Sequence, residues 1–180
     1  MRTDGVDPGP VVGPVVAAEF RSIMSRFATG VTVVTCRQDG MDHAMTANSF
    51  TSVSLDPALV LVCVEADSRF HEAISAVGRW SVSVLSTSQR GRASWFATRG
   101  RPLVGQFDST STQRSVLTDA LLLDDALVSL DCRTVDVHRA GDHDIVVGAV
   151  LDVRLVHPEA DPLVYFGSRF RTLSDQSYRP

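Results

Sequence analysis

Short apolar, β-branched runs follow one another along the chain with only a few residues between them. The runs at 31–37 and 41–47 are separated by Gln38-Asp39-Gly40, and Asp-Gly is a strong signal for a tight hairpin. Asp56-Pro57 precedes the run at 58–65, whose continuous apolar character is typical of a central strand. Short loops between closely following strands favour antiparallel pairing. The pattern therefore predicts a mainly β fold, with a closed antiparallel barrel in place of a parallel doubly wound sheet.

Helices are expected to flank this sheet at three places. Apolar side chains spaced as one helix face predict an amphipathic helix from Ala17 that Gly30 ends (Phe20, Ile23, Met24 and Phe27). A second helix is expected at 69–77, before Gly78, and a short one at 88–98. Further strands are predicted at 50–55, 80–86, 127–138, 144–156, 163–166 and 169–173.

The domain organisation is simple. Residues 1–16 are rich in Gly, Pro and Val, which predicts a flexible N-terminal tail before a single domain at 17–180. The stretch at 99–118 is polar and interrupted by Gly and Pro, so it is expected to be a long excursion from the sheet. Excursions of this length within a domain often serve as functional lids.

The composition excludes several classes of protein. With 44% hydrophobic residues the chain can bury a core, and its net charge of −4 argues against nucleic-acid binding, which needs a basic surface. No apolar stretch has the length of a membrane span or the form of a signal peptide, which predicts a cytoplasmic protein without membrane contact. Cys36, Cys63 and Cys132 lie apart in apolar runs and are expected to be free thiols in a reducing compartment.

All 17 basic residues are Arg, so the chain contains no Lys. This excludes Schiff-base chemistry and a P-loop lysine, and it leaves phosphate binding to Arg, hydroxyls and backbone N–H groups. Glycine-rich nucleotide motifs, a nucleophile elbow and metal-ligand spacings of His and Cys are all missing from the sequence. We therefore predict no metal site and do not favour a hydrolase.

Three segments suggest a binding site. After Thr46, a strand end breaks at Asn48-Ser49 and resumes with hydroxyls at Ser52 and Ser54 on one expected face. Alternating hydroxyls and turn N–H groups can bind the edge of a planar heterocycle or a polyol, although an ordinary Ser- and Thr-rich edge strand has the same pattern. Ser68-Arg69 stands at an expected helix start, where a capping residue also makes a phosphate site.

The third segment is Gly141-Asp142-His143-Asp144 at an expected hairpin. Asp and Gly satisfy the turn, and a turn histidine is commonly just exposed to solvent. Two flanking carboxylates are expected to keep His143 protonated to higher pH, which would suit a polar or anionic ligand.

Together these segments resemble the short-chain flavin reductases, the reductase components of two-component flavin monooxygenases. The match runs in order and spacing from about Phe20 to Leu173. It is carried by GVTVVT (30–35), MTANSFTSVSLDP (45–57), LVLVCVEADSR (59–69), WSVSVLSTSQ (80–89), GDHDIVVGAV (141–150) and PLVYF (162–166). The resemblance implies an FMN-binding split barrel and a homodimer, with flavin in a groove near the subunit interface.

The resemblance also assigns residues to the flavin. It implies that the isoalloxazine edge is bound largely through backbone groups of Thr46, Ala47, Asn48 and Ser49, with Ser52 and Ser54 along the ring and ribityl chain. Cys63 and Val64 would wall the site, and Ser68 and Arg69 would meet the phosphate. Phe70 stands where the family usually has a Thr hydroxyl, which would hold FMN more loosely or favour FAD.

For the nicotinamide, the resemblance implies that His143 orients NADH or NADPH without moving a proton, because hydride passes directly between the two heterocycles. Arg169 and Phe170 are the other residues assigned there, with Phe170 where the family often has Tyr. Arg99, Arg101 and Arg169 could each contact the 2′-phosphate of NADPH. In the excursion Pro102 follows Arg101, where the family usually has Phe.

The leading hypothesis is an NAD(P)H:flavin oxidoreductase that reduces free FMN or FAD and releases it to a separate monooxygenase. One alternative keeps the fold but holds flavin as a prosthetic group, as an oxygenase or another redox enzyme would. The other alternative is a flavin-carrying module without catalysis. A protein that oxidises NADH rapidly only when flavin is added would support the first hypothesis. A protein that is yellow on purification would support the second.

Overall fold

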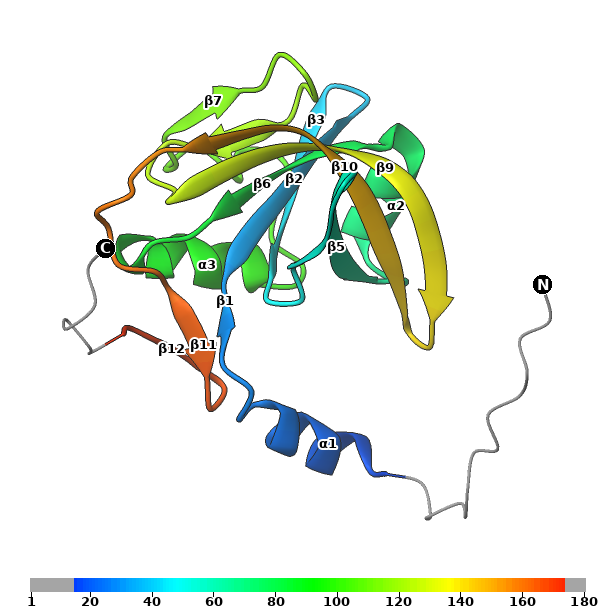
Figure 1. Ribbon diagram of the computed structural model, residues 1–180, viewed down its shortest axis with the longest axis vertical. Helices are drawn as coiled ribbons and strands as arrows, with labels where there is room; N and C mark the ends of the chain where they lie inside the picture. Colours follow the sequence, from blue (N-terminus) through cyan, green and yellow to red (C-terminus); the bar gives the residue numbers. More distant parts are fainter. Residues whose placement is uncertain (1–14, 174–180) are drawn as a thin grey trace.

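The structure of the protein is a computed structural model, in which residues 15–173 are described. Its main element is a seven-stranded, entirely antiparallel sheet in the order β3-β2-β6-β9-β10-β5-β4 (Figure 1). These strands are β2 (Thr32–Gln38), β3 (Met41–Ala47), β4 (Thr51–Leu55), β5 (Ala58–Glu65), β6 (Arg79–Val84), β9 (Val128–Ala140) and β10 (His143–Leu155). The predicted antiparallel, mainly β class is confirmed. Backbone pairing ends at β3 on one side and β4 on the other, so it does not by itself close a barrel.

Two small sheets accompany the large one. The first contains β1 (Thr29–Gly30), β11 (Val164–Phe166) and β12 (Arg169–Arg171) in the order β1-β11-β12. The second pairs β7 (Thr112–Arg114) with β8 (Leu121–Leu123). Strand β7 lies within the stretch at 99–118 that was expected to be an excursion, and β8 follows that stretch. This pair was not predicted, because the polar TQR segment has no strand-like alternation of its own.

Three α-helices flank the strands: α1 (Ala17–Met24), α2 (Arg69–Val77) and α3 (Arg90–Ala97), the last preceded by the 3₁₀ turn η1 (Thr87–Gln89). The predicted end of α2 is confirmed, because Gly78 has a φ of 61° and so provides the left-handed cap that favours glycine. The predicted end of α1 is wrong. The helix stops at Met24, and Gly30 lies in β1, where it pairs with Val164.

The core has two parts, one on each side of the sheet segment that contains β2 and β3. One part packs α2, through Phe70 and Ile74, against the strands around the fully buried Trp80. The other packs α3, through Phe96, against Val33 and Leu85. Helices α2 and α3 therefore pack into different parts of the core, and each of them contacts β3.

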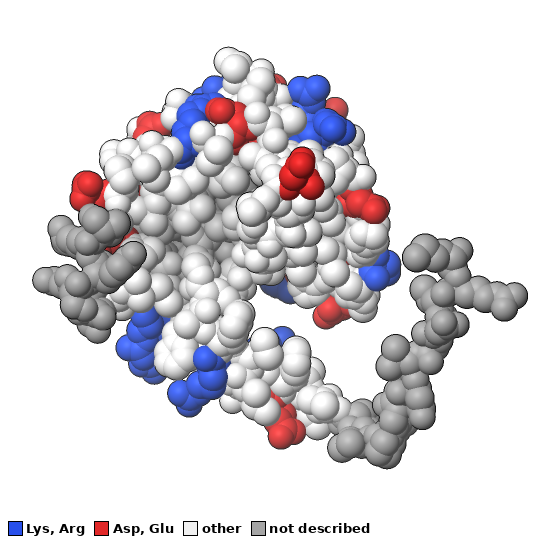
Figure 2. Space-filling model, viewed as in Figure 1, with Lys and Arg blue, Asp and Glu red and all other residues white. Residues whose placement is uncertain are grey.

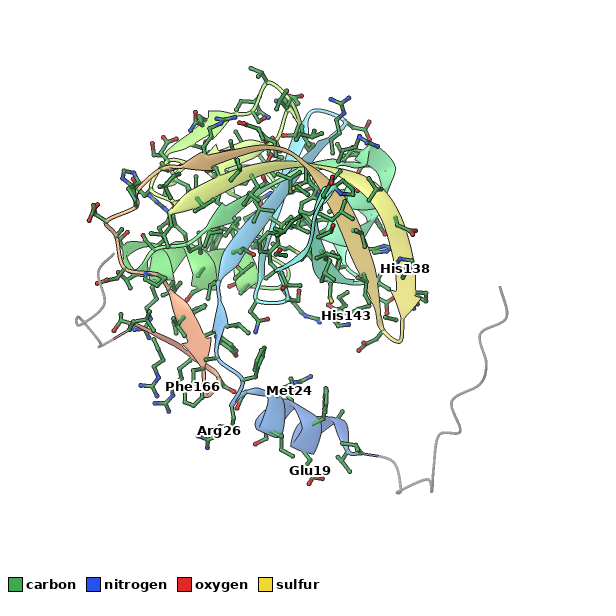
Figure 3. The ribbon with its side chains drawn as sticks, in the orientation of Figure 1. Glu19, Met24, Arg26, His138, His143 and Phe166 are labelled. Atoms are coloured by element: carbon green, nitrogen blue, oxygen red, sulfur yellow. The ribbon has the colours of Figure 1, made fainter. Side chains whose placement is uncertain are left out.

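Strands β9 and β10 form the longest ribbon, with 13 residues each. Only Gly141 and Asp142 connect them, and Gly141 has a φ of 66°, a conformation that a two-residue turn needs. The turn places His143 at the first position of β10, opposite Glu65 of β5. Figure 3 shows His143 near the free end of this ribbon.

Helix α1 lies apart from the main sheet in Figure 1, and none of its residues is buried. Its end contacts the turn between β11 and β12, where Gly167 N–H donates to Ser25 O at 2.7 Å. Most of the predicted tail at 1–16 lies outside the described residues, and Val15 and Val16 are exposed. Among residues 15–173, no helix has the length and apolar character needed to cross a membrane.

Candidate functional site

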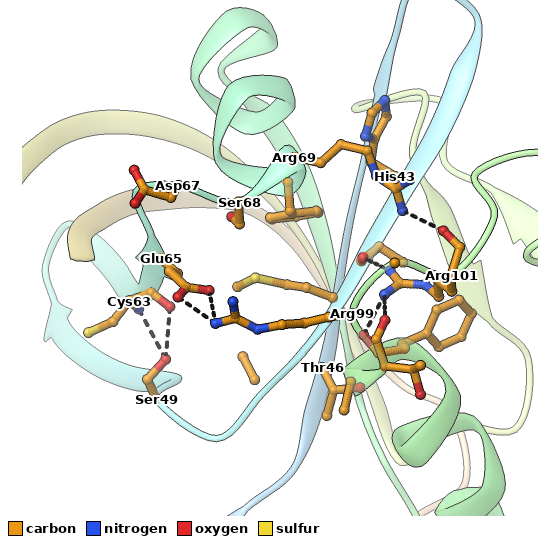
Figure 4. Close-up of a pocket in the computed structure, with 18 of the residues that line it drawn as sticks. His43, Thr46, Ser49, Cys63, Glu65, Asp67, Ser68, Arg69, Arg99 and Arg101 are labelled. Atoms are coloured by element: carbon orange, nitrogen blue, oxygen red, sulfur yellow. Dashed lines mark hydrogen bonds and ion pairs between the residues drawn. The ribbon is translucent and has the colours of Figure 1, made fainter. Parts of the chain in front are cut away.

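A cavity of about 560 Å³ opens where three segments meet: β3 with the turn after it, the start of α2, and the end of α3 with the residues that follow it. The ends of β5 and β10 complete its wall with Cys63, Glu65 and His143. Figure 4 shows how side chains from these elements point toward one another. The volume is within the range of pockets that bind small organic ligands.

The hydroxyls of Thr46 in β3 and of Ser49 in the turn after it already have partners within the protein. Thr46 Oγ1 donates to Ala93 O of α3 at 2.7 Å. Ser49 Oγ accepts from Cys63 N–H at 3.1 Å and donates to Cys63 O at 3.2 Å. These bonds fix β3 to α3 and the turn to β5. The predicted Thr46, Ala47, Asn48 and Ser49 all line the cavity, as does Cys63.

The start of α2 forms a second wall. Ser68 is the helix cap, and its Oγ accepts from His71 N–H at 3.1 Å. The predicted cap is confirmed, and the Ser68 hydroxyl proton is still available to a ligand. Arg69 Nη2 donates to Arg101 O at 3.3 Å. The helix N-terminus, the Ser68 hydroxyl and the Arg69 guanidinium thus face one region of the cavity, which is a favourable arrangement for an anion.

Arg101 is the most firmly held cation of the cavity. Its guanidinium donates to Phe96 O at 2.9 Å, to Thr98 O at 3.1 Å and to Gln106 Oε1 at 3.0 Å, and it also bonds Ala44 O of β3. Burial, together with the nearby charge of Arg69, lowers the pKa of Arg101 to about 10, so it remains charged near neutral pH. Arg101 therefore joins α3, the excursion and β3 at this wall.

His43 is a cavity residue that sequence analysis missed. It is 8% exposed, it lines the cavity from β3, and its Nδ1 has no hydrogen-bond partner within the described residues. Burial lowers the pKa of His43, and the charge of Arg69 lowers it further. A signal was present, because His43 shares the alternation of Met45 and Ala47 on one strand face. A single histidine in a hairpin did not by itself indicate a site.

His143 also lines the cavity, at 41% side-chain exposure. Its Nδ1 lies 2.8 Å from Asp142 Oδ1, which holds the ring in place, and the contact lowers the pKa of Asp142. The second flanking carboxylate does not contact it. Asp144 instead bonds His71 Nε2 at 2.7 Å and lies 3.4 Å from Arg139. Alternation along β10 directs Asp144 away from His143.

Glu65 and Arg99 face each other across the cavity. Arg99 Nη2 lies 2.5 Å from Glu65 Oε1 and 2.6 Å from Oε2. Arg99 was a predicted candidate for contact with a 2′-phosphate, whereas Glu65, which ends an apolar strand without a motif, was not a predicted site residue. The cavity thus combines three arginines with Glu65 and Asp67.

Several predicted residues are not brought to this cavity. Ser52 and Ser54 lie on the edge strand β4, and a register shift sets them opposite Val60 and Leu59, which are neighbours on β5. The two serines therefore do not share one face, contrary to the prediction, because an extra residue in the strand breaks the alternation. Neither serine lines the cavity within this chain.

Val64 and Phe70 pack mainly into the core. Val64 is fully buried and is not part of the cavity wall, because alternation along β5 turns it away from the side of Cys63 and Glu65. Phe70 lines the cavity but is 5% exposed and packs in the core under α2. Its ring takes the core position that the start of an amphipathic helix requires.

Arg169 and Phe170 lie in β12, in the small sheet outside the cavity lining. Phe170 packs edge-on against Tyr165, with ring centroids 5.7 Å apart. Its role here is to hold the β11–β12 hairpin against the core around Phe96. Their predicted contact with nicotinamide stays a prediction.

Comparison with known proteins defines the class to which this fold and cavity belong. Residues 24–174 match the flavin reductase like domain, and the chain belongs to the flavin reductase family. The NADH:riboflavin 5′-phosphate oxidoreductase of Streptomyces pristinaespiralis is 41% identical over 174 residues, covering 94% of each chain. The NADH-dependent FAD reductase of Streptomyces globisporus is 38% identical over 165 residues, covering 91% of this chain and 90% of the relative.

Solved structures agree with this family. The flavin reductase component of a bacterial two-component tryptophan halogenase is 46% identical, with a TM-score of 0.84, covering 89% of this chain and 100% of its own. An NADH:FAD oxidoreductase of Streptomyces globisporus, solved in complex with NAD and FAD fragments, is 35% identical, with a TM-score of 0.86. That structure covers 94% of this chain and 99% of its own. The resemblance found in the sequence is confirmed.

Proposed function

We propose that the protein is an NADH-dependent flavin reductase whose flavin and nicotinamide meet in the cavity beside β3. The observation that carries the proposal is that one cavity collects the backbone of the turn after β3, the start of α2 with Arg69, and His143. These are the three segments that the sequence indicated separately. The family membership and the names of the relatives support the activity.

The residues fit a flavin nucleotide. When bound, the flavin supplies the hydride acceptor and the nicotinamide supplies the donor. Asn48 and Ser49, which follow the end of β3, can bind a heterocycle edge through their backbone groups, whereas Ala47 O already accepts from Thr32 Oγ1 at 3.0 Å. Ser68 and Arg69 provide hydrogen-bond donors and positive charge for a phosphate.

His143 orients the nicotinamide in this proposal. Its contact with Asp142 holds the ring at the cavity wall, where it can donate to or stack on a planar amide. The protein contributes position and electrostatics, because the reaction itself requires no acid or base from the chain. This agrees with the absence of Lys from the sequence.

Both FMN and FAD are proposed as flavin substrates, because relatives of similar identity are named for each of them. NADH is the proposed donor, and the reduced flavin is released to a separate flavin-dependent monooxygenase. This last step is supported by relatives that are components of a two-component tryptophan halogenase and of a styrene monooxygenase. We also propose a single domain at 17–180 after a tail, in the cytoplasm.

The test is a four-way assay of NADH or NADPH with FMN or FAD, using protein purified without added flavin. We expect rapid NADH oxidation only after flavin is added. Failure to oxidise either nucleotide with either flavin would overturn the proposal. A yellow protein with slow turnover of free flavin would instead favour a prosthetic group.

We infer that the active form is a homodimer of split barrels. Four large apolar side chains of α1 and its end are exposed, among them Phe20 at 57% and Ile23 at 61%. Leu151, Val153 and Leu155 on β10 are exposed as well, and few charges interrupt the surface between α1 and the main sheet in Figure 2. Apolar surface of this extent is usually covered by another protein surface, and a second copy of the chain is always available.

Sedimentation analysis tests the homodimer. We expect wild-type protein to sediment as a dimer and Phe20→Glu to shift it toward monomer. Val116→Glu is the control, since Val116 is 94% exposed but lies in the excursion, away from α1. A monomeric wild-type protein, or equal effects of the two substitutions, would show that α1 does not form the interface.

A further inference from the structure

Arg99 and Glu65 come from opposite walls of the cavity and are joined across it. Glu65 is the last residue of β5, and Arg99 follows the end of α3. Arg99 Nη2 lies within 2.6 Å of both Glu65 carboxylate oxygens. In Figure 4 the Arg99 side chain runs through the middle of the view to reach Glu65. Both residues line the cavity, so a ligand that fills it must displace this ion pair.

The Arg99–Glu65 ion pair can be broken at little cost in free energy. The Arg99 side chain is 83% exposed and that of Glu65 is 36% exposed, and ion pairs between exposed groups contribute little net stability. Within residues 15–173, the Arg99 guanidinium has no hydrogen-bond partner other than Glu65. Arg101, two residues later, is held by three backbone carbonyls and Gln106. Of these two arginines, only Arg99 is free to change partner.

A phosphate is the chemical group best suited to replace Glu65. The planar guanidinium binds carboxylate and phosphate oxygens with the same fork geometry. Glu65 pairs with His143 in the sheet, and Ser68, which follows Glu65 closely in the sequence, caps the start of α2. Arg99 therefore reaches the region between the proposed nicotinamide contact and the proposed phosphate contact.

We propose that the Arg99–Glu65 pair is a strap across the cavity, and that an entering nucleotide opens it by giving Arg99 a phosphate in place of the Glu65 carboxylate. This rests on the cavity being the nucleotide site of the proposed reductase. The phosphate can belong to the flavin nucleotide or to NADH, and the experiment separates the two. Only protein with the strap open binds the nucleotide, so the apparent affinity equals the intrinsic affinity multiplied by the fraction of protein in which the strap is open.

The first arm measures riboflavin and FMN binding to full-length wild type, Glu65→Gln and Arg99→Gln by fluorescence titration. Riboflavin has no phosphate, so it reports only the opening of the strap. Both variants are expected to bind riboflavin about two- to fivefold more tightly, the size of an exposed ion pair expressed as an equilibrium constant. If Arg99 takes the flavin phosphate, FMN binds about three- to tenfold more weakly to Arg99→Gln than to Glu65→Gln.

The second arm tests the donor, with riboflavin as the acceptor. If Arg99 takes a phosphate of NADH, Arg99→Gln raises the KM for NADH about three- to tenfold relative to Glu65→Gln. The KM for 1-benzyl-1,4-dihydronicotinamide, which has no phosphate, then differs little between the two variants. Equal effects on the phosphate-bearing and phosphate-free member of both pairs would overturn phosphate capture.

Unchanged riboflavin affinity in both variants would overturn the strap. The control is Arg92→Gln, which removes a 2.7 Å ion pair between α3 and Asp125 without touching this cavity. Arg92→Gln is expected to leave the flavin dissociation constants and the KM values unchanged. If it changes them as much as Glu65→Gln and Arg99→Gln do, the effect comes from the loss of a charge in general and not from the strap. Wild-type protein that does not bind FMN would refute the proposed function itself. If the wild type binds FMN but Glu65→Gln and Arg99→Gln bind both flavins as the wild type does, only the strap is refuted.

Discussion

Gly148 leaves room for the indole of Trp80, and this contact yields a quantitative prediction. Gly148 lies on β10, and an ideal Cβ added there would be 2.4 Å from Trp80 Cζ2, 3.1 Å from Cη2 and 3.2 Å from Cε2. Ordinary carbon contacts are about 3.5–4.0 Å, so in Gly148→Ala the indole and the strand must separate by about 1 Å. Trp80 is fully buried, and its Nε1 donates to Thr134 Oγ1 at 3.1 Å.

The expected cost follows from these contacts. Overpacking a filled core costs about 1–3 kcal/mol, and disturbing the Trp80 hydrogen bond adds about 1 kcal/mol. We therefore expect Gly148→Ala to lower the free energy of unfolding by about 2–4 kcal/mol. With a urea dependence of about 2 kcal/mol per molar, the midpoint of urea unfolding falls by about 1–2 M. Circular dichroism and tryptophan fluorescence both measure it.

Gly91→Ala is the matched control. Gly91 lies in α3, an added Cβ there meets nothing within 4 Å, and its φ is not positive. The same substitution should therefore stabilise the protein by about 0.5–1 kcal/mol, because alanine favours the helix. The reasoning is refuted if Gly148→Ala leaves the urea midpoint unchanged or raises it as Gly91→Ala does.

Three further predictions concern the cavity. Arg69→Ala should weaken FMN binding by about 10- to 100-fold, the contribution of one charge-assisted hydrogen bond, while titration with riboflavin should show little change. His143→Ala should raise the KM for NADH and leave the flavin dissociation constant nearly unaltered in the same preparation. The pKa of His43 is lowered in the folded protein, so below about pH 6.5 the unfolded chain binds a proton that the folded chain does not. The contribution of His43 to stability is therefore full above about pH 6.5 and falls as the pH drops through that value. His43→Gln should lose less stability than wild type when urea midpoints are compared at roughly pH 7.5 and 5.5.

Each of these has an outcome that contradicts it. Equal losses of FMN and riboflavin affinity in Arg69→Ala would mean that Arg69 supports the fold and that the phosphate lies elsewhere. A parallel loss of flavin and nicotinamide binding in His143→Ala would show that the histidine does not act on the nicotinamide alone. If wild type and His43→Gln lose stability equally between the two pH values, His43 is not the group that titrates.

The local elements of the fold could be predicted because their signals are local. Asp39-Gly40 joins β2 to β3, and Ser68 and Gly78 begin and end α2 as expected. The end of α1 could not be predicted in this way. Thr29 and Gly30 pair with β11, which is distant in the sequence. This pairing puts in a strand the end of the segment that the apolar spacing predicted to be helical.

The candidate site could also be predicted only where its signals are local in the sequence. In the motif at 45–57, Asn48 and Ser49 at the turn do line the cavity, whereas Ser52 and Ser54 further along depend on a register that one extra residue shifts. His43 and Glu65 could not be selected from the sequence, because each becomes significant only beside arginines that are distant in the chain. Their role arises from the meeting of β3, β5 and the segment after α3.

The ribbon of β9 and β10 has a consequence for the behaviour of the protein at high concentration. Strand β6 pairs with β9 only up to Arg133, so from Thr134 onward one edge of β9 has no neighbouring strand among the described residues. An open edge invites another chain to add a strand, and this is a common route to aggregation. Here Val137 N–H donates to the Asp136 carboxylate at 2.8 Å, so a side chain occupies a donor that an incoming strand would need. Asp136 is therefore expected to oppose the addition of another strand at this edge.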